Sequence, residues 1–201
     1  MEEKMPLFGR RKPGFGREYL TEDPQEGQVQ EPAPACVGDI LAGFIRQNSG
    51  CGVLVGVKEL LAQDEAMPRY MREMAGSPAC GDIATIEGIQ DTYYYSVNEM
   101  SDFFAMITML TREGNYPRMI AEMVRYNCRV YPASTPEHYF GQSPYRLTPE
   151  QIRQNVDMLK KLPEYKDIRS IRAGNGTPYL YSSDYFTPEY AQALADNTEE
   201  I

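Results

Sequence analysis

The side chain best suited to acid–base chemistry in this sequence is its one histidine. His138 stands beside Glu137 in a Ser-Thr-Pro-Glu-His-Tyr stretch. A catalytic base of this kind needs a nucleophile within reach and a partner that orients the imidazole. The sequence has no Gly-x-Ser-x-Gly motif, no cysteine–histidine signature and no second histidine. We therefore expect no catalytic residues, and we favour a solvent-facing loop position for His138.

The four cysteines could bind a metal or carry out redox chemistry, but their spacing favours neither. They are Cys36, Cys51, Cys80 and Cys128, with no C-x-x-C pair among them. This spacing matches no zinc pattern, and in a reducing compartment it is typical of buried thiols. Gly50–Gly52 and Gly174–Gly176 lack the strand before and the helix after that a phosphate-binding loop requires. We expect no metal and no cofactor, and a cysteine-dependent redox or oxidoreductase accessory role stays as an alternative.

Cations are concentrated in one part of an acidic chain. The net charge is −9, yet residues 111–172 sum to +4 whereas residues 36–110 sum to −6. A local positive field can contact phosphate even when the whole protein is acidic. The candidate contacts for DNA or a protein partner are the cations of this block and two tyrosines of the last predicted hairpin: Arg118, Arg125, Arg129, Lys160, Lys161, Lys166, Arg169, Arg172, Tyr179 and Tyr181.

Aromatic and sulfur-containing side chains are also abundant. The chain has 15 Tyr and 11 Met but no Trp. Tyrosines on a hairpin can stack on bases or form hot spots for a protein partner, and they also suit an ordinary half-buried strand. The methionines recur at helical spacing, which indicates core packing, although Met-rich faces also serve adaptable protein interfaces.

Two similar segments indicate which elements position these side chains. Asp82–Tyr94 and Asp167–Tyr179 align without a gap, with Asp, Ile, Ile, Thr and Tyr in the same places. Gly-Asn-Gly between two β-favouring runs predicts a turn, because Gly and Asn tolerate positive φ. We therefore predict a duplicated β-hairpin, with Ile83 and Ile168 in the turn that leads from a helix into a strand.

Helical periodicity predicts the elements before the first hairpin and between the two. Apolar residues recur at helical spacing in residues 36–50, 53–63 and 65–75, and again in 100–110 and from Pro117 onward. In the first helix we expect Val37, Ile40, Leu41, Phe44 and Ile45 to share the buried face.

Capping signals predict three equivalent helix starts. Ser96-Val-Asn-Glu99 has the spacing of a capping box, and Thr148 and Thr187 are each followed by Pro-Glu. A third, degenerate hairpin is expected between the first two, from Asn127–Tyr131 to Ser143–Tyr145.

The predicted fold class is α+β, mostly helical with two or three β-hairpins in tandem winged-helix-like units. The likeness to a winged helix lies in the plan of the elements over about residues 36–195, and a mainly α-helical bundle is the alternative. We expect a disordered N-terminal arm at 1–34, a first unit at 35–110, and a second unit or units with a C-terminal helix at 111–201. A lone hairpin is marginal in water, so each must pack against its helices.

These features favour a non-enzymatic protein-interaction adaptor over two alternatives. One alternative is a DNA-binding transcriptional regulator that uses the basic region 111–172; the other is the cysteine-dependent role above. No apolar run approaches the roughly 18 residues of a membrane span, and the N-terminus lacks the order of a signal peptide. We therefore expect a cytoplasmic protein with a protein partner, with DNA as a further possible partner and no membrane. The sequence leaves the oligomeric state open.

Overall fold

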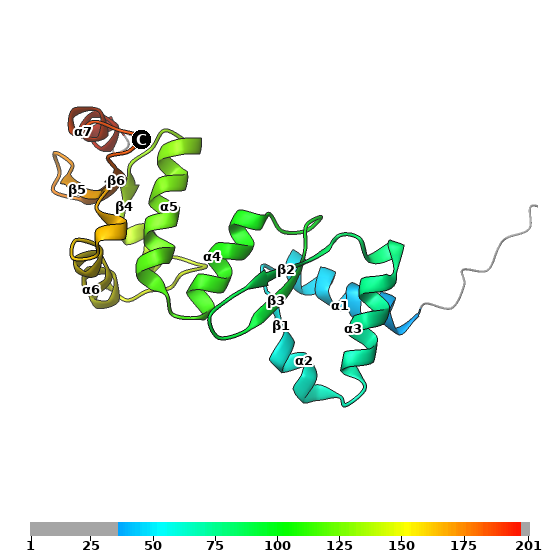
Figure 1. Cartoon of the computed structure of the whole chain (residues 1–201). Helices are drawn as coiled ribbons and strands as arrows, with labels where there is room; N and C mark the ends of the chain where they lie inside the picture. Colours follow the sequence, from blue (N-terminus) through cyan, green and yellow to red (C-terminus); the bar gives the residue numbers. More distant parts are fainter. Residues whose placement is uncertain (1–35, 198–201) are drawn as a thin grey trace, which may run out of the picture. The chain divides into compact units, whose positions relative to one another are not determined.

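The computed structural model describes residues 36–197. The predicted N-terminal arm lies outside the described residues, as do residues 198–201. Within the described range, seven α-helices and two three-stranded antiparallel sheets follow one another along the chain (Figure 1). The predicted α+β class is confirmed, and the alternative of a mainly α-helical bundle is wrong because both hairpins form paired strands. The domain boundary near residue 110 and the tandem winged-helix-like description stay predictions.

The elements up to residue 112 belong to the first sheet and its helices. They are α1 (Val37–Gly50), β1 (Val55–Gly56), α2 (Val57–Gln63), α3 (Met67–Gly76), the 3-10 turn η1 (Pro78–Cys80), β2 (Ile83–Glu87), β3 (Thr92–Ser96) and α4 (Asp102–Arg112). Helices α1 and α3 approach closely at Gly38, where a Cβ atom would lie 2.6 Å from the backbone nitrogen of Met74. Any larger side chain at Gly38 would therefore push the two helices apart.

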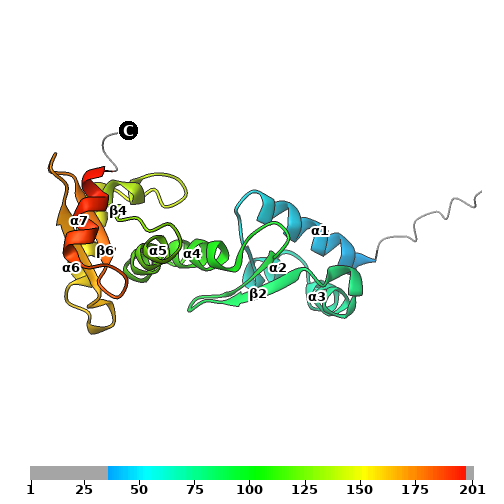
Figure 2. The same ribbon diagram turned by 90° about the horizontal axis from the view of Figure 1, so that it is seen from above.

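The elements from residue 116 onward build the second sheet and its helices. They are α5 (Tyr116–Val130), β4 (Thr135–Pro136), the 3-10 turn η2 (Glu137–Gly141), α6 (Pro149–Leu159), the 3-10 turn η3 (Pro163–Tyr165), β5 (Ile168–Arg172), β6 (Pro178–Ser182) and α7 (Pro188–Asn197). Helix α7 runs beside this hairpin (Figure 2) and contacts β5.

The two sheets have the same strand order. The strand that comes last in sequence lies in the middle of each, giving β1-β3-β2 and β4-β6-β5. In the hairpins Ile83 pairs with Ser96, and Ile168 pairs with Ser182. Strands β2 and β5 are therefore edge strands, each with one side of its backbone free of a neighbouring strand.

Two of the three predicted helix starts are confirmed. The Thr148 hydroxyl accepts a hydrogen bond from the Gln151 amide at 3.2 Å, and the Gln151 side chain accepts one from the Thr148 amide at 2.9 Å. This reciprocal capping box satisfies amides that the first turn leaves unpaired. Helix α7 begins after Thr187, whose hydroxyl accepts from the Tyr190 amide at 3.3 Å.

The predicted helix start at Ser96 is wrong. Ser96 ends β3, and its buried hydroxyl donates to the Asp82 carboxylate at 2.7 Å, so it serves the sheet and not a helix. Helix α4 begins at Asp102, with the Ser101 hydroxyl accepting from the Phe104 amide at 3.3 Å. A residue five positions further on therefore performs the capping role.

The predicted third hairpin is also wrong. Residues 127–130 are the last turn of α5, because the apolar face of this helix continues at helical spacing through Val124 to Cys128. Residues 143–145 form no strand. Short strands occur where none were predicted: Thr135–Pro136 pairs with β6, and Val55–Gly56, placed by prediction in a helix from residue 53, pairs with β3.

The gapless alignment of the two hairpins holds for the first strands and slips by one residue in the second. Ile86 pairs with Tyr93, whereas Ile171 pairs with Tyr179. Tyr179 therefore corresponds to Tyr93, and the second turn is one residue longer, with Gly176 at φ +92°. Ile83 and Ile168 begin β2 and β5 instead of lying before them.

Burial in α1 departs from the predicted face. Leu41 and Ile45 are buried, but Val37, Ile40 and Phe44 are exposed, with Ile40 exposed to 62%. The predicted face was too wide, because α3 and the first hairpin cover only one side of this helix.

A carboxylate from α4 binds the turn of the first hairpin. Glu113, the C-cap of α4, accepts hydrogen bonds from the backbone amides of Ile89 at 2.8 Å and Gln90 at 2.9 Å. Burial acts to raise the pKa of Glu113, but these amides outweigh it and lower the pKa. Among the described residues, no helix is long and apolar enough to span a lipid bilayer.

Candidate interaction surfaces

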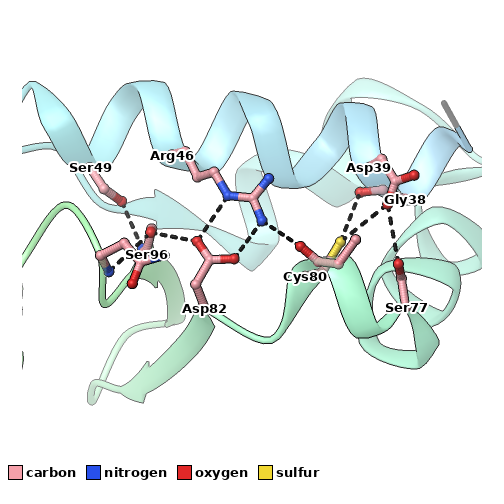
Figure 3. Close-up of polar contacts among 10 residues, drawn as sticks. Gly38, Asp39, Arg46, Ser49, Ser77, Cys80, Asp82 and Ser96 are labelled. Carbon is pink, nitrogen blue, oxygen red and sulfur yellow. Dashed lines mark hydrogen bonds and ion pairs between the residues drawn. The ribbon is translucent and has the colours of Figure 1, made fainter. Parts of the chain in front are cut away.

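A buried polar cluster connects α1 to the first hairpin (Figure 3). The Arg46 guanidinium holds both oxygens of the Asp82 carboxylate, with Nε to Oδ2 at 2.9 Å, and donates to the Ala79 carbonyl at 2.8 Å. The Ser96 hydroxyl donates to the same carboxylate at 2.7 Å. Hydrogen bonding from Arg46 holds the pKa of Asp82 well below its usual range.

The second half of the chain repeats this cluster with the same atoms. Arg125 of α5 donates from Nε and Nη2 to the two Asp167 oxygens at 3.0 and 2.6 Å, and to the Glu164 carbonyl at 2.9 Å. The Ser182 hydroxyl donates to Asp167 at 2.8 Å. Burial acts to raise the pKa of Asp167, but the hydrogen bonds from Arg125 and Ser182 outweigh it and lower the pKa.

One further position in this cluster differs between the two halves. The Ser96 amide donates to the Ser49 hydroxyl at 3.0 Å, whereas the Ser182 amide donates to the Cys128 sulfur at 3.4 Å. Burial raises the pKa of the Cys128 thiol, which favours the protonated form. In both clusters the serine is buried and the aspartate is at most one-tenth exposed, while the arginine is half-buried. The hydrogen bonds of each cluster indicate a structural role, because they fasten a helix to the start and end of a hairpin.

Arg125, one of the predicted partner contacts, therefore lies in a structural cluster. Its side chain is only 25% exposed and also forms an ion pair with Glu122. Tyr179 and Tyr181 are buried, so their rings serve the sheet and its packing. Arg118 and Arg129 are exposed at opposite ends of α5, and Arg118 acts electrostatically on Tyr165, the neighbour of Lys166.

The remaining predicted cations gather along the edge strand β5. Lys160, Lys166 and Arg169 line a hollow of about 420 Å³ together with Tyr165, Ile168, Ser170 and Tyr181. Lys161 is exposed next to Lys160, and Arg172 is exposed at the far end of β5, where it donates to the Gly176 carbonyl at 3.0 Å. The last turn of α6 and the first strand of the hairpin thus place the cations on one surface.

A second hollow, whose lining includes six aromatic rings, lies between α4, α5 and the residues around β4. It has a volume of about 520 Å³, and Phe103 of α4 stacks on Tyr126 of α5 with ring centroids 3.8 Å apart. Tyr131 meets Tyr126 edge-on at 5.8 Å, and its side chain is 64% exposed. The other aromatic and proline residues of the lining are Phe104, Pro136, Tyr139, Pro144 and Tyr145.

Sequence reasoning missed this aromatic hollow. It noted that tyrosines are abundant, but Phe103 and Tyr126 lie 23 positions apart on different helices, and no periodicity within one element reports their stacking. The only sequence signal was the tyrosine count itself, which cannot say which rings meet.

A third hollow is smaller and lies over α1, α2 and α3. It encloses about 290 Å³ and is lined by Val37, Ile40, Leu41, Phe44, Leu60, Gln63, Met67 and Tyr70. Its lining includes Val37, Ile40 and Phe44, the three residues of α1 that were expected in the core and are exposed.

The cysteines and the histidine do not meet in a reactive site. Cys36 and Cys51 are exposed, Cys80 and Cys128 are buried, and burial raises the pKa of both buried thiols. Across residues 36–197, His, Cys, Asp and Glu form no group of three that could hold a metal ion. His138 is exposed on η2, in agreement with a surface position.

Comparison with known proteins places the chain in a family. A family model described as the YdhW C-terminal domain matches residues 114–201, the part that contains α5 to α7 and the second sheet. No solved structure matches the chain. The uncharacterized protein YdhW of Escherichia coli (strain K12) is 32% identical over 173 residues, which cover 84% of this chain and 79% of that protein. Identity at this level over most of both sequences means that the chain belongs to the YdhW family.

Proposed function

We propose that this protein is a non-enzymatic adaptor that binds a protein partner through the aromatic hollow of α4 and α5. The observation that carries the proposal is the open stack of Phe103, Tyr126 and Tyr131 above a hollow of about 520 Å³. Exposed, preorganised rings are the side chains that most often supply binding energy at protein interfaces, because they bury a large area at a small cost in side-chain entropy.

The polar groups around this hollow are largely paired within the protein. The Asn127 amide donates to the Thr135 hydroxyl at 2.9 Å, and hydrogen bonding between the Tyr126 and Tyr131 hydroxyls raises the pKa of Tyr126. A partner therefore meets mostly apolar surface without leaving buried donors unsatisfied. The exposed cation Arg129 lies near the rim of this hollow, because it is one helical turn after Tyr126 and acts on it electrostatically. The favoured occupant is therefore an apolar segment of a partner flanked by acidic residues.

Photocrosslinking tests this proposal. A benzophenone amino acid in place of Tyr131 should produce one discrete protein adduct in cells that make this protein, and the same label in place of Tyr185, another exposed tyrosine, should not. The adduct partner is then purified and titrated against the unlabelled protein. Binding should weaken on the order of tenfold or more with Tyr126→Ala and remain with Tyr190→Ala. Equal labelling from Tyr131 and Tyr185, or full binding by Tyr126→Ala, would contradict the adaptor proposal.

DNA binding is a second candidate because Lys160, Lys166 and Arg169 share one hollow. The exposed face of α6 argues against it. Arg153 pairs with Glu150, and Lys160 lies 3.0 Å from Asp157, so the helix that would enter a DNA groove carries carboxylates beside its cations.

Anisotropy of labelled random-sequence duplex DNA across a salt series separates the two candidates. Binding that falls steeply with salt, and that is lost when Lys160, Lys161, Arg169 and Arg172 become Glu, would favour the DNA-binding regulator. No binding at low salt favours the adaptor. A cysteine-dependent accessory role has less support at the two buried thiols, since burial raises the pKa of Cys80 and Cys128. Fast alkylation of these two thiols in the native protein would be needed to revive that role.

A further inference from the structure

Strand β5 is an edge strand, so one side of its backbone has no neighbouring strand. The hydrogen bonds at the two ends of the hairpin show which residues of β5 bond to β6 and which face the open side. The Ser183 amide donates to the Asp167 carbonyl at 2.8 Å, and the Ala173 amide donates to the Thr177 carbonyl at 3.0 Å. In an antiparallel pair, hydrogen-bonded positions alternate along the strand. The odd-numbered residues of β5 therefore bond to β6, and the amides and carbonyls of Ile168, Ser170 and Arg172 face the open edge.

Most of this open edge has no partner within the described part of the chain. The Arg172 carbonyl accepts from the Gln192 side chain at 2.8 Å, which closes the end of the strand nearest α7. Ser170 is exposed, its backbone amide and carbonyl face the open edge by the alternation above, and the residue lines the hollow beside Lys160, Lys166 and Arg169. An edge of this kind is a template for an added strand.

The side chains around the edge specify the charge of an added strand. Lys160, Lys166 and Arg169 surround the hollow beside Ser170. Among residues 36–197, Lys166 and Arg169 form no ion pair, whereas Lys160 forms an exposed ion pair with Asp157 at 3.0 Å. Grouped cations repel one another, and an anionic partner relieves that repulsion.

The first sheet shows that the fold does not require these cations. Strand β2 has the same phase, because the Val97 amide donates to the Asp82 carbonyl at 2.9 Å, and its edge-facing residues are Ile83, Thr85 and Glu87. Counted from the paired aspartates Asp82 and Asp167, the positions of Lys166, Arg169 and Arg172 are occupied by Gly81, Ala84 and Glu87. The cations of β5 are therefore an addition to a frame that also forms without them.

We propose that the open edge of β5 binds an extended acidic segment of a protein partner. The segment pairs its backbone with Ile168 and Ser170, and its carboxylates lie against Lys160, Lys166 and Arg169. A second copy of β5 is a poor occupant, because pairing two such edges brings cation against cation. The inference rests on the proposed adaptor function, and it adds a second contact surface and the chemistry of the segment that fits it.

The test uses a fluorescein-labelled peptide of about eight residues in which Glu and Val alternate, added to the full-length protein. We expect binding in anisotropy at low salt and none of a Lys–Val peptide of the same length. Replacing Lys166→Gly, Arg169→Ala and Arg172→Glu together, which installs the residues of the first sheet, should weaken binding on the order of tenfold or more.

A proline pair separates strand addition from mere charge attraction. Ser170→Pro removes an amide that faces the open edge and leaves the ladder to β6 intact, and Thr85→Pro does the same at the equivalent place in β2. We expect Ser170→Pro to abolish peptide binding and Thr85→Pro to preserve it, with both variants folded by circular dichroism. If Ser170→Pro does not fold, a peptide N-methylated at alternate backbone nitrogens replaces it, and its binding to the unaltered protein should be lost.

Each other outcome overturns the inference. Binding that survives both Ser170→Pro and N-methylation would mean a charged surface without strand pairing. Tighter binding of duplex DNA than of the peptide would assign the cations to nucleic acid, and a concentration-dependent dimer lost in the triple variant would assign the edge to self-association. Absence of peptide binding would refute the β5 inference alone, because the adaptor function is tested separately by crosslinking at Tyr131.

Discussion

The two sheets of this protein share an interior frame and differ at their surface. In each, an arginine from the first helix of that half, α1 or α5, donates to an aspartate at the start of the hairpin, and a serine at the end of the hairpin donates to the same carboxylate. Beyond that frame, β5 and the turns before it carry cations where the first sheet has none. The comparison shows that the polar cluster is kept while the exposed charge changes, so the fold of each sheet does not depend on that charge.

The largest effect should come from truncating the equivalent core residues Leu60 and Phe140. Each is the fourth residue after its short strand, and both are fully buried. Phe140→Ala should lower the free energy of unfolding by about 4 kcal/mol and Leu60→Ala by about 3 kcal/mol, in proportion to the cavity that each leaves. Urea denaturation measures both. A smaller loss in Phe140→Ala than in Leu60→Ala would show that the two positions are not packed alike.

The next largest effect should come from removing the arginine of each cluster, and the loss of unfolding free energy should differ between the two clusters. Arg125→Ala leaves the Asp167 carboxylate, 5% exposed, without its cation, and should cost about 3 kcal/mol of unfolding free energy. Arg46→Ala should cost less, because Arg46 and Asp82 are more exposed, at 35% and 10%. The check is urea denaturation at neutral pH, with Arg153→Ala as an exposed control that should change little. A greater loss at Arg46 would reverse this ranking of the two clusters.

Acid should act on both clusters, and more strongly on the first. The folded pKa values of Asp82 and Asp167 are lowered, so their stabilisation is present above the unfolded pKa near 4 and is lost as pH falls toward the folded values. Stability should therefore decline from about pH 5 downward. Asp82→Asn should flatten this decline more than Asp167→Asn, because burial opposes the lowering most at Asp167. Urea denaturation midpoints of the unaltered protein and both variants, measured across this pH range, test this prediction. If stability falls with pH equally steeply in both variants and in the unaltered protein, the clusters are not the source of the acid sensitivity.

The smallest effect should follow from making the clusters identical. Cys128→Ser installs the residue that Ser49 supplies in the first half, where the hydroxyl accepts the Ser96 amide at 3.0 Å. We expect a change within about 1 kcal/mol, since a stronger acceptor offsets the loss of an apolar sulfur. Thermal unfolding of Cys128→Ser and of the reverse change Ser49→Cys provides the measurement. A loss of several kcal/mol of unfolding free energy in Cys128→Ser would mean that packing of the Cys128 sulfur, and not its hydrogen bond with the Ser182 amide, stabilises the contact between α5 and β6.

Local signals in the sequence predicted much of the secondary structure. Thr148 and Thr187 begin helices as expected, because the cap, the proline after it and the apolar period agree over one turn. The first strands of both hairpins align as predicted. Prediction failed at Ser96, where a capping pattern competes with the Asp82 carboxylate, an acceptor that only the folded hairpin brings within reach.

The candidate surfaces were less predictable than the elements. The cations of the basic region were named from the sequence, and the structure gathers three of them, Lys160, Lys166 and Arg169, in one hollow. Arg125 was named with them, but it lies in a buried cluster, because its position on α5 places it against Asp167, 42 residues later. The aromatic hollow was not predicted at all.

By itself, the sequence determined what local physics decides: the helix caps at Thr148 and Thr187, the turns of two hairpins, the α+β class and the separation of an acidic from a basic region. The tertiary structure alone decided which cation is buried and which is free, which rings stack, and that β1 and β4 complete each sheet. The physical reason is the distance along the chain over which each interaction acts. Capping and periodicity act within a few residues, whereas the pairing of Arg125 with Asp167, of Phe103 with Tyr126 and of β4 with β6 depends on chain segments that meet only when the core is packed.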